Sequence, residues 1–233
     1  MSPAAADHRG ARRILIVGAG GFGREVLVWA RAAWPEAAAK LGGFLAEERG
    51  ECCSLPIVAS PASFAPHPDD ALVLAIGIPD VRRRVAEALL ARGGRFLTLI
   101  HPTAIVAASA SIGEGSVLCP YSIASDATTL GRFTLLNYHA SLGHDASTGD
   151  FSVLAPYATL GGGARVAADV FMGLHTSVAP GKSVGASSKV SANSACLADV
   201  PAGSLVFGVP GRVTRRLDMA ASSSDPPGGP SRS

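Results

Sequence analysis

Two neighbouring residues in the middle of the chain, His144 and Asp145, have the side chains needed for proton transfer. A histidine can accept a proton at neutral pH, and a carboxylate beside it stabilises the protonated imidazolium. Such a pair can act as the general base that removes a proton from an attacking nucleophile. The alternative is a histidine and an aspartate that merely share a surface turn.

A glycine-rich segment near the N-terminus has the pattern of a phosphate-binding turn. Gly18, Gly20 and Gly23 form a Gly-x-Gly-x-x-Gly motif between an apolar run and a helical stretch. Glycines at such a turn let backbone N–H groups approach a phosphate at the helix N-terminus. An NAD site could use Glu47 or Glu48 for a ribose hydroxyl. The α/β segment is, however, too short for a full dinucleotide fold.

The cysteines and histidines do not have the spacing of a metal site. Cys52 and Cys53 are adjacent, while Cys119 and Cys196 are isolated. No Cys-x-x-Cys or Cys/His zinc pattern occurs. We therefore expect buried or incidental thiols and no bound metal.

The second half of the chain repeats every six residues. From Val106 to Cys196 every sixth position is apolar except Thr148, and no insertion interrupts the series. The members are Val106, Ile112, Leu118, Ala124, Leu130, Leu136, Leu142, Thr148, Leu154, Leu160, Val166, Met172, Val178, Val184, Val190 and Cys196. Small residues usually stand one position later and again four positions later, as at Gly113 and Ser116.

This period predicts a parallel β-helix. Each hexad forms a short strand and a turn, and three hexads form one triangular coil with the apolar residue on the axis. Small residues let the chain bend at the corners, and coils must stack because one coil cannot bury its apolar edge. A β-sandwich is the alternative, but its strands alternate with a period of two and its turns vary in length. We expect an all-β β-helix over residues 101–218.

The first half alternates between strands and helices. Apolar runs at 14–17, 41–45, 71–76 and 96–100 predict strands, and residues 24–33 and 81–92 have helical spacing. This order predicts a small Rossmann-like α/β domain with a parallel sheet over residues 13–100. Residues 1–12 and 219–233 are expected to be disordered tails, because their composition cannot bury apolar surface.

The composition excludes several classes of partner. Hydrophobic residues make up 48% of the chain and charged residues 16%, which suits a packed core. A net charge of +2 gives no electrostatic signature for nucleic acid or an anionic membrane. No apolar run is long enough to cross a bilayer, and the N-terminus lacks the apolar core of a signal peptide. We expect a cytoplasmic protein that binds neither nucleic acid nor membranes.

Several blocks, in their order and spacing, carry a resemblance to a known family. They are ILIVGAGGFGREV, LGGFL, LAIGIPDVRRRV and LTLIHPTAIV, followed by LNYHASLGHDASTGDFSVLAPYATLGG and VFGVPGRV. The chain resembles the hexapeptide-repeat acetyltransferases, in the subgroup of sialic acid O-acetyltransferases and nucleotide 4-amino-sugar N-acetyltransferases. The resemblance implies a left-handed β-helix, acetyl-CoA as co-substrate, a sugar acceptor and a homotrimer, with no metal.

The resemblance also implies roles for individual residues. His144 is expected to be the general base and Asp145 its partner. The positions that match the family's cofactor contacts are Val153, Leu174, Ala192 and, as an oxyanion donor through its N–H, Gly162. The positions that match acceptor contacts are Gly20, Gly21, Phe22, Glu47 and Gly77, and His139 is a further candidate for contact with substrate.

Three positions depart from the family pattern. Val153 and Phe22 stand where relatives often carry histidine, and Ala46 stands where an acidic residue often occurs. A site that loses polar groups discriminates against ligands that need them, so we expect poor use of UDP-linked 4-amino sugars. The acetylated group of the sugar could be an amine or a hydroxyl. A non-catalytic β-helix protein that binds a ligand or scaffolds a complex is the alternative from another class.

Overall fold

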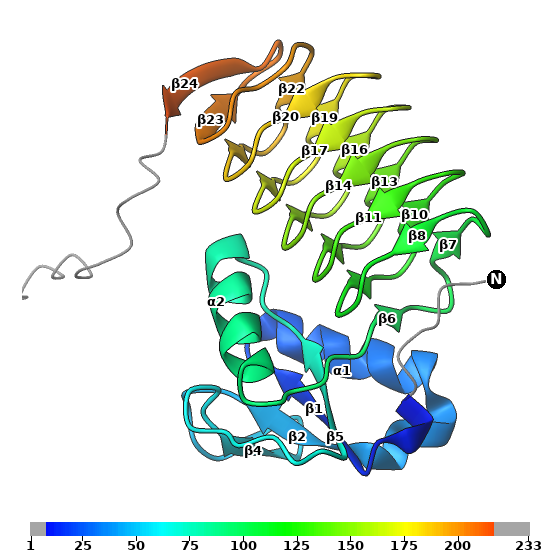
Figure 1. Ribbon diagram of the computed structural model, residues 1–233, viewed down its shortest axis with the longest axis vertical. Helices are drawn as coiled ribbons and strands as arrows, with labels where there is room; N and C mark the ends of the chain where they lie inside the picture. The colour runs from blue at the N-terminus through cyan, green and yellow to red at the C-terminus, as the bar shows by residue number, and fades with distance from the viewer. Residues whose placement is uncertain (1–7, 217–233) are drawn as a thin grey trace, which may run out of the picture.

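The computed structural model describes residues 8–216, and Figure 1 shows two parts arranged along its long axis. The lower part is an α/β domain built on a five-stranded sheet, and the upper part is a tall prism of short parallel strands. The predicted fold class is thereby confirmed: a small domain with a mainly parallel sheet precedes a left-handed parallel β-helix.

The sheet of the α/β domain is formed by apolar strands, and its two faces are both covered by other parts of the molecule. Its sheet has the order β3-β4-β2-β1-β5 and is parallel except for the β3–β4 hairpin. Ile14 to Val17 of the central β1 are buried, as expected for a parallel strand covered on both faces, and all of β5 is buried although it stands at the edge of the sheet. The elements are β1 (Arg13–Val17), α1 (Gly21–Ala33), the 3-10 helix η2 (Pro35–Lys40), β2 (Leu41–Leu45), β3 (Glu51–Cys52), β4 (Leu55–Ala59), β5 (Asp70–Leu74) and α2 (Pro79–Leu90).

Strand β4 was not predicted from the sequence. Its residues alternate between half-buried and exposed, and Pro56 interrupts its apolar run. Such a segment lacks the continuous apolar character by which the buried strands were recognised.

The strand expected at 96–100 is divided between the two parts of the molecule, which corrects the prediction. Phe96 makes only an isolated parallel bridge to Leu72 of the α/β sheet. Leu99–Ile100 (β6) instead pairs with Val117–Leu118 of the β-helix. The cause is the hydrogen bonding of the first coil, since the N–H of Leu99 donates to the carbonyl of Ser116 at 2.9 Å.

Part of the N-terminal segment expected to be disordered is packed. His8–Gly10 form the 3-10 helix η1, and the ring of His8 stacks on Trp34 with centroids 5.2 Å apart. The Nε2 atom of His8 also lies 2.7 Å from a carboxylate oxygen of Glu36. Residues 1–7 and the tail expected at 219–233 lie outside the described residues.

The β-helix has three faces of two-residue strands. The first face holds β6 (Leu99–Ile100), β9 (Val117–Leu118), β12 (Leu135–Leu136), β15 (Val153–Leu154), β18 (Phe171–Met172), β21 (Lys189–Val190) and β23 (Ser204–Phe207), followed by the antiparallel β24 (Arg212–Arg216). The second holds β7 (Ile105–Val106), β10 (Ile123–Ala124), β13 (Ser141–Leu142), β16 (Thr159–Leu160), β19 (Ser177–Val178) and β22 (Ala195–Cys196). The third holds β8 (Ser111–Ile112), β11 (Thr129–Leu130), β14 (Ser147–Thr148), β17 (Arg165–Val166) and β20 (Ser183–Val184).

The six-residue apolar series fills the axis of this prism. The residues from Ile112 to Cys196 in that series are buried, and their apolar members form one continuous core. Thr148, the polar exception, is buried as well, and its hydroxyl lies 3.4 Å from that of Thr134. The glycines that follow core positions stack directly on the next coil: a Cβ on Gly113 would lie 2.5 Å from the backbone of Gly131.

The corners of the prism carry a feature that the repeat did not predict. The third residue after each core position often has a left-handed φ, and several of these residues are large, among them Tyr121, Phe133 and His139. Left-handed φ is costly for residues other than glycine. Here the side chains project outward and stack on their equivalents one coil away, and this contact offsets the cost.

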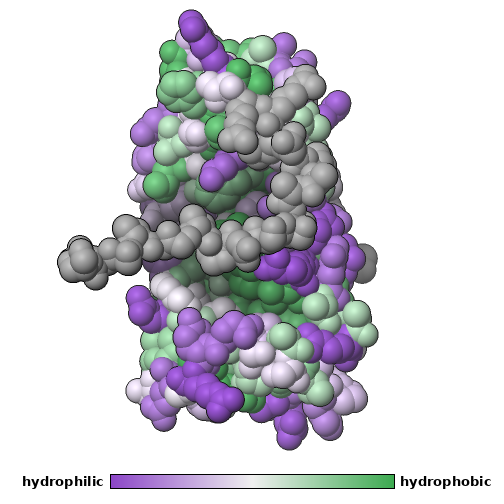
Figure 2. All heavy atoms as spheres, turned by 90° about the vertical axis from the view of Figure 1, so that its left-hand side faces the viewer, coloured by the Kyte–Doolittle hydropathy of each residue, from purple (hydrophilic) through white to green (hydrophobic). Residues whose placement is uncertain are grey.

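Helices α1 and α2 pack on opposite faces of the α/β sheet, and both also contact the β-helix (Figure 1). Residues of α1 such as Val26 and Leu27 share one apolar cluster with Val117, Leu135 and Val153 of the first face. Figure 2 shows the side on which α2 lies, where apolar residues are visible near the middle of the molecule and mainly hydrophilic residues lie towards its lower end. The α/β domain therefore docks on the first face through a shared apolar core.

The far end of the β-helix is covered on all three faces. On the first, β24 turns back antiparallel to β23. On the second, the N–H of Ala195 donates to Gly208 at 3.1 Å and its carbonyl accepts from Gly211 at 2.7 Å. On the third, Val200 forms a bridge with Val184.

Candidate active site

His144 and Asp145 lie on the turn after β13, at the corner between the second and third faces. The ring Nδ1 is 2.8 Å from Oδ2 of Asp145, and the two side chains are 72% and 65% exposed. The tautomer follows from this contact: with Nδ1–H donating to the carboxylate, Nε2 keeps a free lone pair. The N–H of Asp145 donates to the carbonyl of Asp126 on the preceding coil at 2.9 Å. The backbone therefore fixes the turn that carries this pair.

Gly162, one coil further on, lies directly beneath the His144 ring. A Cβ at position 162 would lie 2.5 Å from Nε2 and 2.6 Å from Cε1 of His144, so only glycine admits the ring in this position. The N–H of Gly163 donates to the carbonyl of His144 at 2.8 Å and holds the two coils together. Within residues 8–216, no group accepts a hydrogen bond from the N–H of Gly162. That donor is therefore available to a ligand beside the imidazole.

The other three expected cofactor contacts lie elsewhere on the prism. Leu174, 47% exposed, and Ala192, also exposed, occupy successive coils at the corner between the first and second faces. Val153 is only 2% exposed, because it packs in the apolar cluster beneath the α/β domain. The structure brings Leu174 and Ala192 together and separates both from His144.

His139 belongs to the corner of Leu174 and Ala192. Its ring stacks between Tyr121 at 5.1 Å and Tyr157 at 4.7 Å, and Tyr157 stacks in turn on His175 at 4.6 Å. We call this ladder of four rings (Tyr121, His139, Tyr157, His175) the aromatic corner. His139 was expected from the sequence as a site residue but the ladder was not, although its members recur every eighteen residues.

The expected acceptor contacts gather at the carboxyl ends of the parallel strands of the α/β domain. Gly20 and Gly21 follow β1, Glu47 follows β2 and Gly77 follows β5. The ends of parallel strands are the usual ligand site of such sheets. Phe22 differs from its neighbours, because its half-buried ring packs edge-on against Trp29, with centroids 5.9 Å apart.

Two adjoining cavities open at these strand ends. One, of about 380 Å³, is lined by Gly20, Arg24, Arg49 and Cys52 among others, and the second, of about 580 Å³, by Ala46, Glu47 and Ser60. Glu48 and Arg49 border both. The two arginines were not expected as site residues: Arg24 follows the glycine-rich motif without being part of it, and Arg49 lies in no motif.

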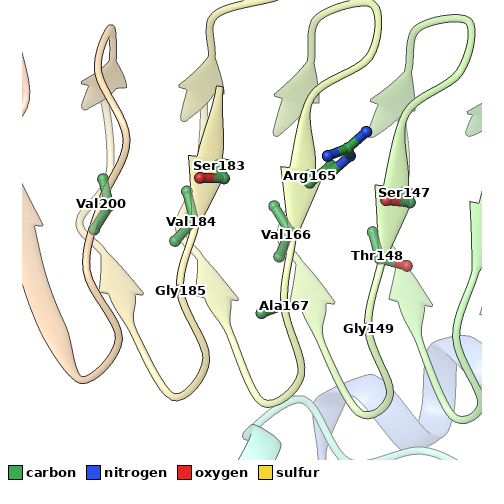
Figure 3. A pocket seen from close by; sticks show the side chains of 10 residues that line it. All are labelled: Ser147, Thr148, Gly149, Arg165, Val166, Ala167, Ser183, Val184, Gly185 and Val200. Atoms are coloured by element: carbon green, nitrogen blue, oxygen red, sulfur yellow. The ribbon is translucent and has the colours of Figure 1, made fainter. Parts of the chain in front are cut away.

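A shallow groove of about 390 Å³ runs along the third face next to the His144 corner (Figure 3). The side chains of Ser147, Arg165 and Ser183 line it from successive coils. None of the site residues expected from the sequence lines this groove.

The described part of the chain has neither a metal-binding cluster nor a membrane-spanning helix. Residues 8–216 contain no cluster of three His, Cys, Asp or Glu side chains that could hold a metal ion. They also contain no helix that is long and apolar enough to span a membrane.

Comparisons with known proteins bear on both parts of the chain. The model of the PglD N-terminal domain matches residues 13–89. UDP-N-acetylbacillosamine N-acetyltransferase of Bacillus subtilis is 49% identical over 51 residues, which cover 22% of this chain and 24% of that protein. The match thus spans about a quarter of the length of this curated relative.

Solved structures resemble the chain over most of its length. The acetyltransferase domain of PglB from Neisseria gonorrhoeae is 26% identical, with a TM-score of 0.79, over 87% of this chain and 99% of that one. PerB from Caulobacter crescentus, solved with CoA and GDP-perosamine, is 24% identical, with a TM-score of 0.78, over 87% of this chain and 97% of that one. The resemblance to nucleotide 4-amino-sugar N-acetyltransferases is thereby confirmed.

Proposed function

We propose that this chain transfers the acetyl group of acetyl-CoA to the amino group of a nucleotide-linked sugar. The observation that carries the proposal is His144, which is oriented by Asp145 and packs against Gly162, whose N–H has no acceptor within residues 8–216. A PglD-type N-terminal domain and a likeness to a solved acetyltransferase domain along nearly its whole length support the same activity. This combination favours an enzyme over a non-catalytic β-helix scaffold.

The proposed reaction needs one proton acceptor and one oxyanion donor. The sugar amine attacks the thioester carbonyl carbon while Nε2 of His144 takes the amine proton. The N–H of Gly162 donates to the oxyanion of the tetrahedral intermediate. When the C–S bond breaks, the imidazolium returns the proton to the CoA thiolate, which leaves as the free thiol. Asp145 stabilises the imidazolium between these two steps.

We expect the side chains that line the two cavities of the α/β domain to determine which nucleotide the chain accepts. Ala46 lines the larger cavity with an apolar methyl group where relatives often carry a carboxylate, so the prediction of poor use of UDP-linked 4-amino sugars stands. The argument from Phe22 is weaker, since its ring packs on Trp29 and does not line either cavity.

A substrate panel tests this proposal. Release of CoA thiol should be fastest with a nucleotide-linked amino sugar, and the unaltered chain should use UDP-linked 4-amino sugars poorly. Ala46→Asp should raise kcat/KM for a UDP-linked sugar, while Phe22→His alone should change it little. Acetylation of only a hydroxyl group would indicate an O-acetyltransferase, and no transfer to any acceptor would contradict the proposal.

We further propose that the chain acts as a homotrimer with the active site shared between copies. His144 and Gly162 stand at one corner, while His139, Leu174 and Ala192 stand at the next, so one chain does not close a slot around acetyl-CoA. His139 and His144 lie in the same coil, so two copies with parallel axes bring these corners together at matching height. Closed three-fold symmetry would repeat the contact at every interface.

Subunit mixing tests the shared site. His144→Ala and Leu174→Glu should each be nearly inactive alone. After mixed refolding, about a quarter of the sites should pair an intact His144 with an intact Leu174 from another copy, if assembly is random and symmetric. Activity should recover to the same fraction of the activity of the unaltered protein, and sedimentation should show a trimer. No recovery, or a fully active monomer, would contradict the shared site.

A further inference from the structure

Arg82 of α2 is a fully buried cation that touches both parts of the molecule. Its Nε donates to the carbonyl of Phe133 on the β-helix at 2.7 Å. Its Nη1 donates to the carbonyls of Leu74 at 3.1 Å and Ile76 at 2.8 Å, at the end of β5. One guanidinium group therefore joins the loop after β5 to the β-helix.

This arginine is held without a carboxylate. Burial lowers the pKa of Arg82 to about 9, and within residues 8–216 its Nη2 has no hydrogen-bond partner. Burying a charge with an unsatisfied donor is costly. A well-packed apolar residue would often serve stability equally well, so the geometry that the guanidinium imposes points to a role beyond packing.

The loop held by Arg82 supports the glycine-rich turn. Gly18 packs so closely on this loop that a Cβ there would lie 2.6 Å from the carbonyl oxygen of Ala75. Ala75 stands between the two residues, Leu74 and Ile76, whose carbonyls Arg82 holds. A displacement of this loop would thus be passed on to the turn that carries Gly20.

The next residue, Arg83, binds the β-helix further along the corner that carries Phe133. Its Nε and Nη2 each donate to a different carboxylate oxygen of Asp169 at 2.7 Å, and its guanidinium lies 4.2 Å from the centre of the Phe151 ring. Phe151 stacks on Phe133 with centroids 4.9 Å apart. Two consecutive arginines therefore hold three successive coils, at Phe133, Phe151 and Asp169.

The same contacts border a cleft between the two parts. A cavity of about 240 Å³ is lined by Ile78, Pro79 and Asp80 at the start of α2 and by Asp169, Phe171 and Lys189, among others, on the β-helix. Asp169 is both a wall of this cavity and the anchor of Arg83. The two arginines thus set the separation of its walls.

We propose that Arg82 and Arg83 are positioning residues that hold the acceptor-binding strand ends in register with the acetyl-transfer corner. This inference rests on the proposed function. Apart from an ion pair with Glu87 on its own helix, the side-chain contacts of Arg83 are made across the junction, so it governs the alignment of two bound substrates and not the affinity for either. Arg82 acts on the alignment and also on the loop that supports the glycine-rich turn.

The experiment uses the full-length chain with three neighbouring arginines of α2. Arg82→Met and Arg83→Met remove the guanidinium groups, and Arg82→Lys and Arg83→Lys keep the charge but not the forked geometry. Arg84→Met is the matched control, because Arg84 is exposed on the same helix. For each variant, kcat per acetyl-CoA-binding site and both KM values are measured, and the Kd for GDP and UDP is measured calorimetrically without acetyl-CoA.

Arg83→Met should lower kcat about 10- to 100-fold with both KM values unchanged, because small misplacements of reacting groups carry penalties of this size. Arg83→Lys should recover part of the loss. Arg82→Met should lower kcat and also weaken binding of the better nucleotide about tenfold, the equivalent of one charge-assisted hydrogen bond. Arg84→Met should match the unaltered chain in every measurement.

A merely structural role would give a different result. The variants would then lose thermal stability and active fraction, while kcat per site stayed normal, and that outcome would overturn the proposal. If Arg82→Met fails to fold, the kcat and KM values of Arg83→Met and Arg83→Lys decide whether these arginines position the substrates, because Arg83 is only half-buried. If the unaltered chain acetylates no acceptor, the proposed function fails, but nucleotide affinity still tests Arg82: equal Kd values in Arg82→Met and Arg84→Met would refute its effect on the loop.

Discussion

Replacing His144 with alanine should lower kcat by about 10²- to 10⁴-fold, the usual contribution of a general base. The fold should survive, because the side chain is exposed on a turn and, within residues 8–216, hydrogen-bonds to Asp145 alone. Asp145→Asn should have a smaller effect, since it removes the stabilisation of the imidazolium but leaves the base in place. The measurement is steady-state acetyl transfer at saturating acetyl-CoA, with circular dichroism and sedimentation as checks on the fold.

A second histidine serves as the control for this prediction. His67 lies in an exposed loop of the α/β domain, beside Asp69, and His67→Ala should leave kcat unchanged. Added imidazole should restore part of the activity of His144→Ala by filling the vacated space. Near-normal turnover in a correctly folded His144→Ala protein would remove His144 from the mechanism, and His139 would then be the next candidate.

Gly162→Ala should lower kcat about 10- to 100-fold, although it replaces no charged or titratable side chain. The added methyl group would stand 2.5 Å from Nε2 of His144, and such a separation is too short for nonbonded atoms. The imidazole must therefore move away from Gly162. Because Gly162 is not among the glycines with a left-handed φ, alanine fits its backbone, and thermal stability should change little.

Gly181→Ala is the matched control, on the same corner one coil further along. Its φ is +68°, and a Cβ there meets no atom within 4 Å. Any loss of kcat that comes from backbone strain should therefore appear in Gly181→Ala. A loss of kcat that comes from displacing His144 should appear only in Gly162→Ala. Equal loss of activity in the two variants would mean that the contact between Gly162 and the ring has no catalytic importance.

The fold was predictable where one physical requirement repeats. The apolar residue at every sixth position from Ile112 to Cys196 is required because each of these positions is buried on the axis. A series of this length does not arise by coincidence. The boundary near Leu99 was not predictable in the same way. An apolar strand can pair with either part of the molecule, and only the hydrogen bonds of the first coil decide between them.

The candidate site was predictable in its residues but not in its arrangement. His144 and Gly162 are eighteen residues apart, so the repeat itself stacks them. The separation of Leu174 from His144 depends on which side of the triangular coil each turn occupies, and the sequence analysis did not assign the turns to corners. Arg82 was missed for another reason: nothing in the run Arg82-Arg83-Arg84 shows which of the three is buried.

The covered end of the β-helix limits how copies of this chain can associate. A stack of parallel strands that ends bare offers rows of free N–H and C=O groups, and these invite another chain to continue the stack into a fibre. Here β24, Gly208 and Val200 occupy that position on the three faces, while the α/β domain packs along the first face (Figure 1). Open-ended polymerisation along the axis is thereby blocked, and association is directed to the sides of the prism, where the assembly can close on itself after a fixed number of copies.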